Sequence, residues 1–180
     1  MQENLYIKRI LFKEIVDGDI RKLNAQSNDA NTGGGARDFR FKPQNKFWKF
    51  FSKLCSIQDS KGILKDKFHW YIDGQEIITE MEVYSPTKSR PNEIRLSKVN
   101  SCIPSAALPQ SSGSVIFLIS QRSDGQLWPY FITLQSLRND DWDPALKKVI
   151  ENALSAHKRK SVSAMGYYDY ETKEEYYYEQ

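Results

Sequence analysis

A short cationic segment, residues 85–96 (SPTKSRPNEIRL), contains the residue types in this chain that are best suited to recognising a polar ligand. Its cations are Lys88, Arg90 and Arg95, and Glu93 is the single carboxylate among them. Lysine and arginine donate hydrogen bonds to phosphates, and arginine also forks onto the N7 and O6 acceptors of guanine. A carboxylate among them can fix arginine rotamers or accept a hydrogen bond from N4 of cytosine. The pattern favours a discriminating recognition loop; the alternative is a solvated hairpin loop with surface ion pairs.

A second polar loop is centred on a run of three glycines. It lacks the Gly-Lys-Ser/Thr ending of a P-loop, and a strand-like pattern (DFRF) follows it instead of a helix whose N-terminus could hold phosphate. Glycines do let a backbone approach a ligand closely, and the neighbouring polar side chains can bond base edges or phosphate oxygens. The candidate ligand-binding residues of this loop are Asn28, Asn31, Thr32, Gly33, Gly34, Gly35 and Arg37.

Alternating apolar residues and turn signals predict the elements that position both loops. The segments FHWYID, QEIITEMEVY, VIFLISQ and LWPYFITL are typical of strands, and two Asp-Gly turns predict hairpins. The segment NKFWKFFSKL predicts an amphipathic helix with Phe47, Phe50, Phe51 and Leu54 on one face. A second helix is expected with Asp143 as N-cap and Pro144 at its first position. This mixture predicts a mixed, mostly β domain: an open β-barrel of about seven strands with two or three flanking helices.

The chain has 180 residues and a net charge of +3, which fits one domain over residues 1–160. Residues 161–180 show no core periodicity and are expected to be an acidic, tyrosine-rich tail or linker.

Two cysteines are too few for a disulfide framework, and no Cys/His cluster indicates zinc. The longest apolar run, VIFLI, is too short to span a bilayer, so we expect a cytoplasmic protein without a membrane partner.

The residue patterns give no support for catalysis. A Mg²⁺-dependent nuclease needs converging carboxylates, usually with a lysine two positions after the second acid, but Tyr84 stands there behind Glu80 and Glu82. Residues 59–61 (DSK) have the spacing but lie in a polar turn. Neither histidine has a recognisable partner serine or cysteine. We therefore expect a binding protein with no enzymatic activity and no cofactor.

The order of the segments SNDANTGGGARDFRF, KSRPNEIRL, SGSVIFLISQRSDGQ and DPALKKVIENAL resembles a DNA-binding pseudobarrel. This fold forms the N-terminal effector-binding domain of the EcoRII restriction enzyme, and plant auxin-response-type DNA-binding domains are similar to it. In that family two arms grip the major groove, and the basic arm reads Lys-x-Arg-Asn-Glu-x-Arg. Here that pattern falls on Lys88, Arg90, Asn92, Glu93 and Arg95, with Pro91 as a one-residue insertion. The glycine arm would be residues 28–37, where Ala-Arg replaces the family's His-Gln.

The resemblance, over roughly residues 5–155, implies sequence-specific recognition of double-stranded DNA by both arms. The chain would be the DNA-binding domain or specificity component of a restriction-modification system, with a nuclease domain or subunit as a further partner. Besides the glycine arm, the implied DNA-binding residues are Lys88, Ser89, Arg90, Asn92, Glu93, Arg95 and Lys98. The residues themselves leave a second function open, a protein-interaction module whose basic loop binds an acidic partner.

Overall fold

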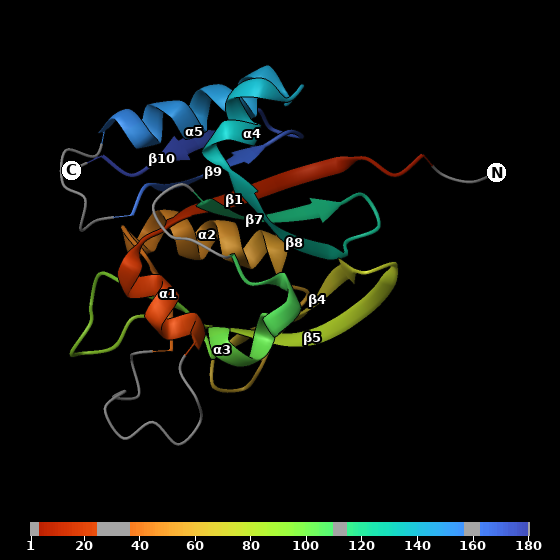
Figure 1. Cartoon of the computed structure of the whole chain (residues 1–180). Helices are drawn as coiled ribbons and strands as arrows, with labels where there is room; N and C mark the ends of the chain where they lie inside the picture. The colour runs from red at the N-terminus through yellow and green to blue at the C-terminus, as the bar shows by residue number, and fades with distance from the viewer. Residues whose placement is uncertain (1–3, 25–36, 110–114, 157–162, 180) are drawn as a thin grey trace. The chain divides into compact units, whose positions relative to one another are not determined.

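A computed structural model describes residues 4–24, 37–109, 115–156 and 163–179 (Figure 1). The chain divides into two compact units, a terminal unit of residues 1–16 with 111–180 and a central unit of residues 17–110. The described residues form ten strands, five α-helices and one short 3₁₀ helix. The expectation of a mixed, mostly β fold is confirmed. The expected numbers were about seven strands and two or three helices, and the described residues exceed both.

The terminal unit contains an antiparallel sheet in the order β10-β9-β1-β7-β8. Its strands are β1 (Ile7–Ile15), β7 (Val115–Arg122), β8 (Leu127–Thr133), β9 (Met165–Asp169) and β10 (Glu175–Tyr177). The hairpin of β7 and β8 turns at one of the predicted Asp-Gly pairs, where Gly125 has φ 85. A positive φ of this kind is the conformation that glycine adopts without steric cost.

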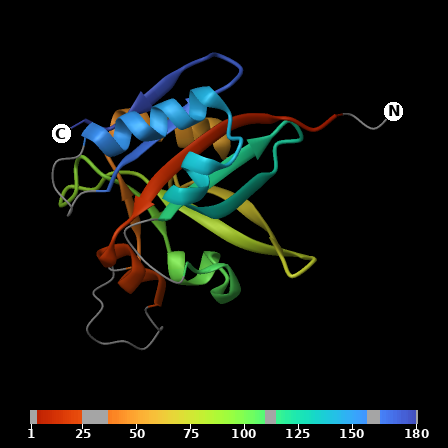
Figure 2. The same cartoon turned by 45° about the horizontal axis from the view of Figure 1, so that its top comes forward.

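Two helices belong to the terminal unit, α4 (Leu134–Asn139) and α5 (Pro144–Ala156). The Asp143 carboxylate accepts from the Leu146 backbone N–H at 3.0 Å, which confirms it as the N-cap of α5. Leu146, Val149 and Ile150 of α5 are buried in a core that also contains residues of β1, β7 and β9. Figure 2 shows α5 lying along the β9 and β10 hairpin, on which it packs.

The segment expected to be a tail, residues 161–180, is part of this fold. β9 pairs with β1, β10 pairs with β9, and every residue of β9 is buried. A Cβ atom on Gly166 would lie 2.3 Å from the Tyr176 carbonyl oxygen and 2.7 Å from the Phe12 ring, so the packing requires glycine there. The expectation of a tail or linker is corrected for residues 163–177: because both faces of β9 are covered, its sequence lacks the alternation that marks a half-buried strand.

A charged cluster fastens this hairpin to β1. The Arg9 guanidinium donates to Asp169 at 3.1 Å, to Gln121 at 2.8 Å and to Glu171 at 2.6 Å. Asp169 is completely buried and also accepts from the backbone N–H groups of Glu171 and Thr172. Asp169, which belongs to the segment expected to be an acidic tail, is a buried anchor.

The central unit has a sheet in the order β4-β5-β6-β2, with β3 paired to β4. Its strands are β2 (Phe39–Phe41), β3 (Ile57–Gln58), β4 (Leu64–Ile72), β5 (Gln75–Tyr84) and β6 (Ile94–Ser97). Its helices are α1 (Asp17–Asn24), α2 (Gln44–Leu54), α3 (Val99–Cys102) and the 3₁₀ helix η1 (Ser105–Ala107). The hairpin of β4 and β5 turns at Asp73 and Gly74, with φ 50 and 80, as a type I′ turn requires.

The predicted helix α2 supplies much of the core of the central unit. Phe47, Phe50, Phe51 and Leu54 are all buried, as the spacing predicted. The Phe41 ring of β2 lies 5.3 Å from the ring of Phe47 and 5.2 Å from that of Phe51.

Both cysteines are free thiols, and burial raises the pKa of each to about 12. None of the described helices is long and apolar enough to cross a membrane.

Replacing Asp169 by alanine should lower the free energy of unfolding by about 3–5 kcal/mol, because the mostly buried Arg9 and two backbone donors lose their acceptor. Glu171→Ala is the matched control, since it removes a carboxylate bonded to the same arginine but 34% exposed. That variant should lose about 1 kcal/mol or less. Urea unfolding followed by circular dichroism measures both; equal losses would contradict the anchoring role of Asp169.

Candidate nucleic-acid interface

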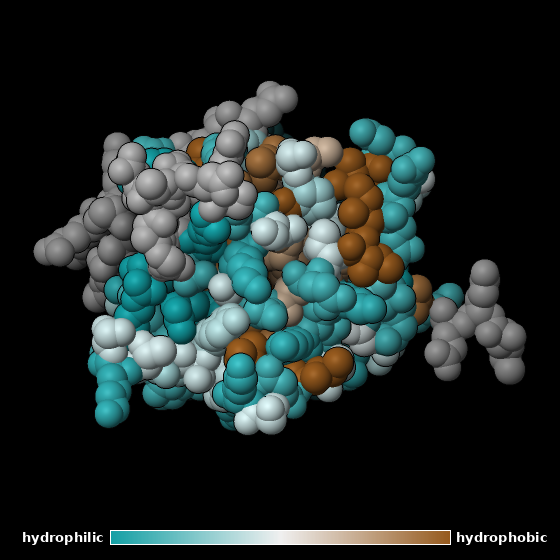
Figure 3. All heavy atoms as spheres, turned by 90° about the horizontal axis from the view of Figure 1, so that it is seen from below, coloured by the Kyte–Doolittle hydropathy of each residue, from teal (hydrophilic) through white to brown (hydrophobic). Residues whose placement is uncertain are grey.

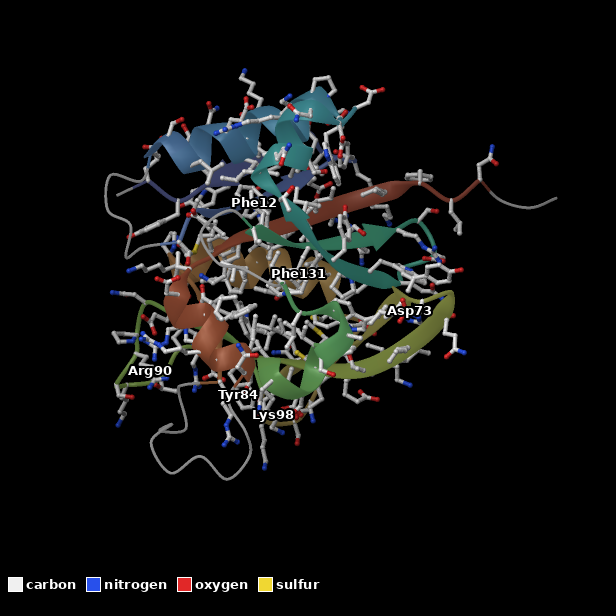
Figure 4. The ribbon with its side chains drawn as sticks, viewed as in Figure 1. Phe12, Asp73, Tyr84, Arg90, Lys98 and Phe131 are labelled. Atoms are coloured by element: carbon white, nitrogen blue, oxygen red, sulfur yellow. The ribbon has the colours of Figure 1, made fainter. Side chains whose placement is uncertain are left out.

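The basic arm, residues 85–96, connects β5 to β6 and includes β6 up to Leu96. Its tip is a two-residue turn at Lys88 and Ser89, closed by backbone hydrogen bonds in both directions between Thr87 and Arg90 at 3.3 and 3.0 Å. Pro86 and Pro91 flank this small hairpin and restrict φ on either side of it. Figure 4 shows Arg90 at the outer end of the arm. The two prolines and the closed turn make the arm a preorganised projection.

Glu93, the single acid of the arm, lies next to an arginine from another strand. Its Oε2 is 3.6 Å from Nε of Arg40, in the middle of β2. β2 pairs with β6 so that Arg40 stands directly opposite Arg95. We expected Glu93 to fix the arginines of the arm or to accept from cytosine. Among the described residues, its ion pair is instead with Arg40 of β2. The alternation in DFRF already indicated that Arg40 faces away from the buried Phe39 and Phe41, but sequence reasoning did not select it.

Arg95 is held in place from two sides. Its Nη1 lies 3.7 Å from Oδ2 of the buried Asp38, and its guanidinium carbon lies 5.4 Å from the centre of the Tyr84 ring. Tyr84 is the β5 residue opposite Arg95, so Arg40, Arg95 and Tyr84 form one row across three strands. This row is the polar face of the sheet beside the basic arm.

Two polar atoms of this row, Nε of Arg40 and Nε of Arg95, are buried without a hydrogen-bond partner among the described residues, and so is Oε2 of the neighbouring Glu93. The Arg40–Glu93 contact is an ion pair that is slightly longer than a hydrogen bond. A buried donor or acceptor left without a partner costs about 1–3 kcal/mol. A ligand that reaches the row and supplies those partners would recover part of this free energy.

Glu82 extends the network on the same face. Its carboxylate accepts from the Tyr84 hydroxyl at 2.9 Å and lies 3.5 Å from Nζ of Lys98 and 3.7 Å from Nζ of Lys65. Burial acts to raise the pKa of Glu82, but the hydroxyl and the two ammonium groups outweigh it and lower the pKa. The hydrogen bond to Glu82 in turn raises the pKa of Tyr84. Lys98, a predicted DNA-binding residue, is therefore directed toward a carboxylate, although it is 64% exposed.

Asp59 and Glu82, the carboxylates considered for a metal site, both contact Lys65. Asp59 lies 3.1 Å from Nζ of Lys65 and accepts from the backbone N–H groups of Lys61 and Ile63. The hydrogen bond from Ile63 is the main reason why the pKa of Asp59 is lowered. Within the described part of the chain, no three His, Cys, Asp or Glu side chains gather where a metal ion could bind.

The glycine arm is described only at its end. Asn28, Asn31, Thr32, Gly33, Gly34 and Gly35 lie outside the described residues. The Arg37 carbonyl accepts from the backbone N–H of Val99 at 2.9 Å, which joins the end of this arm to the start of α3. Because β2 and β6 are antiparallel, Arg37 and Glu93 lie at opposite ends of their ladder. Ser89 and Asn92 are exposed in the basic arm.

Comparison with known proteins gives no relative from which a role could be transferred: no family model matches the sequence, and no curated protein matches it.

Glu82 should make stability sensitive to acid. Its pKa in the folded state lies below the ordinary 4.5, so its contribution is present above that pH and is lost as the pH falls through the folded-state pKa. The free energy of unfolding of Glu82→Gln should therefore fall less steeply between pH 5.5 and pH 3 than that of the parent chain. Denaturant unfolding at each pH measures this. Glu80→Gln is the control, since Glu80 is 78% exposed; if it flattens the profile equally, the network around Glu82 is not the cause.

Proposed function

We propose that this chain recognises double-stranded DNA in a sequence-specific manner, with the basic arm and the row of Arg40 and Arg95 as its contact surface. The observation that carries the proposal is a division of labour among the cations. Lys88 and Arg90 project from a closed hairpin and make no ion pair with any described residue, while Arg40 and Arg95 are held in place behind them. Cations on a projecting turn suit contacts with phosphates, which carry no sequence information. Arginines that are held in one position can also distinguish bases.

The chemistry of the four cations fits the surface of a DNA duplex. Lys88 at the exposed turn is a point charge that can neutralise a phosphate and release its counterion. Arginine can form two parallel hydrogen bonds to N7 and O6 of guanine in the major groove. A β-hairpin is narrow enough to enter that groove, which admits a two-stranded ribbon. The buried Nε atoms of Arg40 and Arg95 have no hydrogen-bond acceptor among the described residues, and a ligand on the same face could supply one.

Glu93 gives this surface a means of discrimination. Its Oε2 lacks a hydrogen-bond donor within the described residues while standing 3.6 Å from Arg40. It can therefore position Arg40 for a guanine, or accept from N4 of cytosine directly. In either case, a base that offers no partner leaves a buried charge unpaired, which is costly.

The resemblance to restriction-enzyme effector domains supports the same role and extends it. The glycine arm, residues 28–37, would form the second grip on the major groove. The chain would then be the specificity component of a restriction-modification system, and the cutting would belong to a nuclease domain or subunit. The role proposed for this chain is binding without catalysis.

Duplexes selected from a random pool provide the ligand for testing the arm. Lys88→Ala should weaken binding to selected and scrambled duplexes about equally and lower the salt slope of log Kd by about one. Arg95→Ala should lose about 1–3 kcal/mol on the selected duplex and far less on scrambled DNA. Fluorescence anisotropy across a salt series measures both. Lys61→Ala is the matched control, an exposed lysine in the turn before β4.

The DNA proposal fails if the parent chain binds selected and scrambled duplexes with equal affinity, or if Lys61→Ala weakens binding as much as Lys88→Ala. Equal affinity for all duplexes would favour the other function left open by the sequence, a basic loop that binds an acidic protein. A steep salt slope together with a preference of roughly a thousandfold for the selected duplex would support DNA recognition.

Glu93→Ala tests discrimination separately from attraction. Removing a negative charge beside phosphate should strengthen binding to scrambled DNA, whereas the loss of the Arg40 partner or of the cytosine acceptor should weaken binding to the selected duplex. The ratio of the two affinities should therefore fall by about tenfold or more, as expected for about 1–3 kcal/mol. Both affinities are measured at one salt concentration. Glu80→Ala is the charge control, because it removes a carboxylate of β5 outside the proposed DNA surface and should leave the ratio of the two affinities unchanged. If Glu93→Ala strengthens both affinities by the same factor, Glu93 has no role in discrimination.

A further inference from the structure

The long β4 and β5 hairpin leaves one edge of the central unit's sheet open. β4 pairs with β5 along the whole strand from Gln75 to Val83, but β6 pairs only with the stretch from Glu82 to Tyr84. Within the described part of the chain, residues 75–81 therefore have β4 as their only strand partner. Among the residues that the structure describes, no strand lies beside the backbone N–H and C=O groups on their other side.

The cause of this open edge is a change of direction after β6. Lys98 adopts the left-handed conformation, with φ 54 and ψ 41, and turns the chain into α3 instead of continuing along β5. The Cys102 carbonyl of α3 accepts from Trp70 Nε1 at 3.2 Å and from the Thr79 hydroxyl at 2.6 Å. α3 thus contacts the face of the hairpin that contains Trp70, and the opposite face contains Glu76, Ile78 and Glu80.

The side chains of this edge are unusual for a strand that only meets water. Ile78 is 53% exposed, and Ile77 and Tyr71 beside it are exposed as well. Figure 3 shows that strongly hydrophobic side chains form only small areas within a largely hydrophilic surface. Ile78 stands between two exposed carboxylates on the same face of the strand: Glu76, which lies 2.6 Å from Nδ1 of His69, and Glu80, which lies 4.0 Å from Nζ of Lys67.

We propose that residues 75–80 of β5 bind an extended segment of a partner protein by β-strand addition. The unpaired backbone groups would supply the main-chain hydrogen bonds of a new antiparallel strand, and alternate side chains would select its sequence. Opposite Glu76, Ile78 and Glu80 the segment should present a basic, an apolar and a basic residue, because opposite charges and apolar pairs stabilise cross-strand neighbours. The partner is therefore a protein with an exposed basic and β-branched segment.

A second copy of this chain fits the edge poorly. Pairing two copies of β5 antiparallel with Ile78 opposite Ile78 would set Glu76 of each copy opposite Glu80 of the other. Like charges directly opposite are destabilising. The two carboxylates thus keep copies apart and favour a basic segment, in line with the charged side chains by which edge strands avoid self-pairing.

The edge is separate from the proposed DNA surface. β5 has ten residues, so its two ends lie roughly 30 Å apart, with the hairpin turn at one end and the basic arm at the other. Figure 4 shows Asp73, in that turn, and Arg90, in the arm, at opposite ends of the central unit. A partner strand at this edge therefore leaves the basic arm open to its own ligand.

The probe is a fluorescein-labelled peptide, Thr-Lys-Thr-Val-Ile-Lys-Thr, added to the whole chain at low salt. It should bind saturably with a Kd of about 100 µM or tighter, and it should slow amide hydrogen exchange along residues 75–80. Ile78→Lys should weaken binding about tenfold or more. Ile57→Lys is the matched control, since Ile57 is 56% exposed but lies on β3, and it should bind as the parent chain does. The double variant Glu76→Lys and Glu80→Lys should instead prefer a peptide with glutamate in place of lysine.

The proposal is overturned if the peptide does not saturate, if both lysine variants weaken it equally, or if exchange slows elsewhere. Sedimentation velocity supplies a further test, because a dimer that Ile78→Lys dissociates would assign the edge to a second copy. Ile78→Lys should keep the circular dichroism spectrum and the urea midpoint of the parent chain, which shows that the variant is folded. Failure of peptide binding leaves the DNA proposal untouched, and failure of DNA binding leaves this one untouched.

Discussion

The pairing of β2 with β6 is the constraint on which the candidate interface depends. Phe39 and Phe41 of β2 are buried, as are Ile94 and Leu96 of β6, and the register alternates them with Arg40 and Arg95. Because successive side chains in a strand point to opposite faces, burying the apolar set places both arginines on the other face. A slip of one residue in either strand would bury the arginine of that strand, so the register is strongly specified. Two cations directly opposite each other are unfavourable, and the nearby carboxylates of Asp38 and Glu93 offset that cost.

The same carboxylates decide which cations are available to a ligand. Arg95 is confined by Asp38 and the Tyr84 ring, and Lys98 is drawn to Glu82, whereas Lys88 and Arg90 at the hairpin have no such partner among the described residues. A side chain that is already confined loses little conformational entropy on binding, so the fixed arginines suit recognition of one geometry. The projecting pair suits attraction to any anionic surface. The interface combines both kinds of cation within one sheet.

Local patterns predicted most of the elements, because their causes are local. The Asp-Gly turns, the apolar face of α2 and the cap of α5 each depend on residues close together in the sequence. What the sequence could not show depends on distant partners. Glu93 was predicted to orient an arginine, but its neighbour Arg40 is brought there only by the pairing of β2 with β6. The strand β9 was missed because its residues are buried on both faces, and Asp169 was counted with an acidic tail although Arg9 pairs with it in the interior.

The two proposals assign ligands of opposite charge to two surfaces of the central unit. The chain as a whole carries only +3, and that average conceals a cationic arm that follows β5 and two carboxylates on β5 itself, Glu76 beside His69 and Glu80 beside Lys67. Salt at physiological strength screens exposed charges beyond about 8 Å, far less than the length of β5. Each surface therefore acts by its own local field: Glu76 and Glu80 repel phosphate from the edge, and Lys88 and Arg90 repel a basic segment from the arm. If both proposals hold, two ligands of opposite charge would bind one sheet without competing for the same residues.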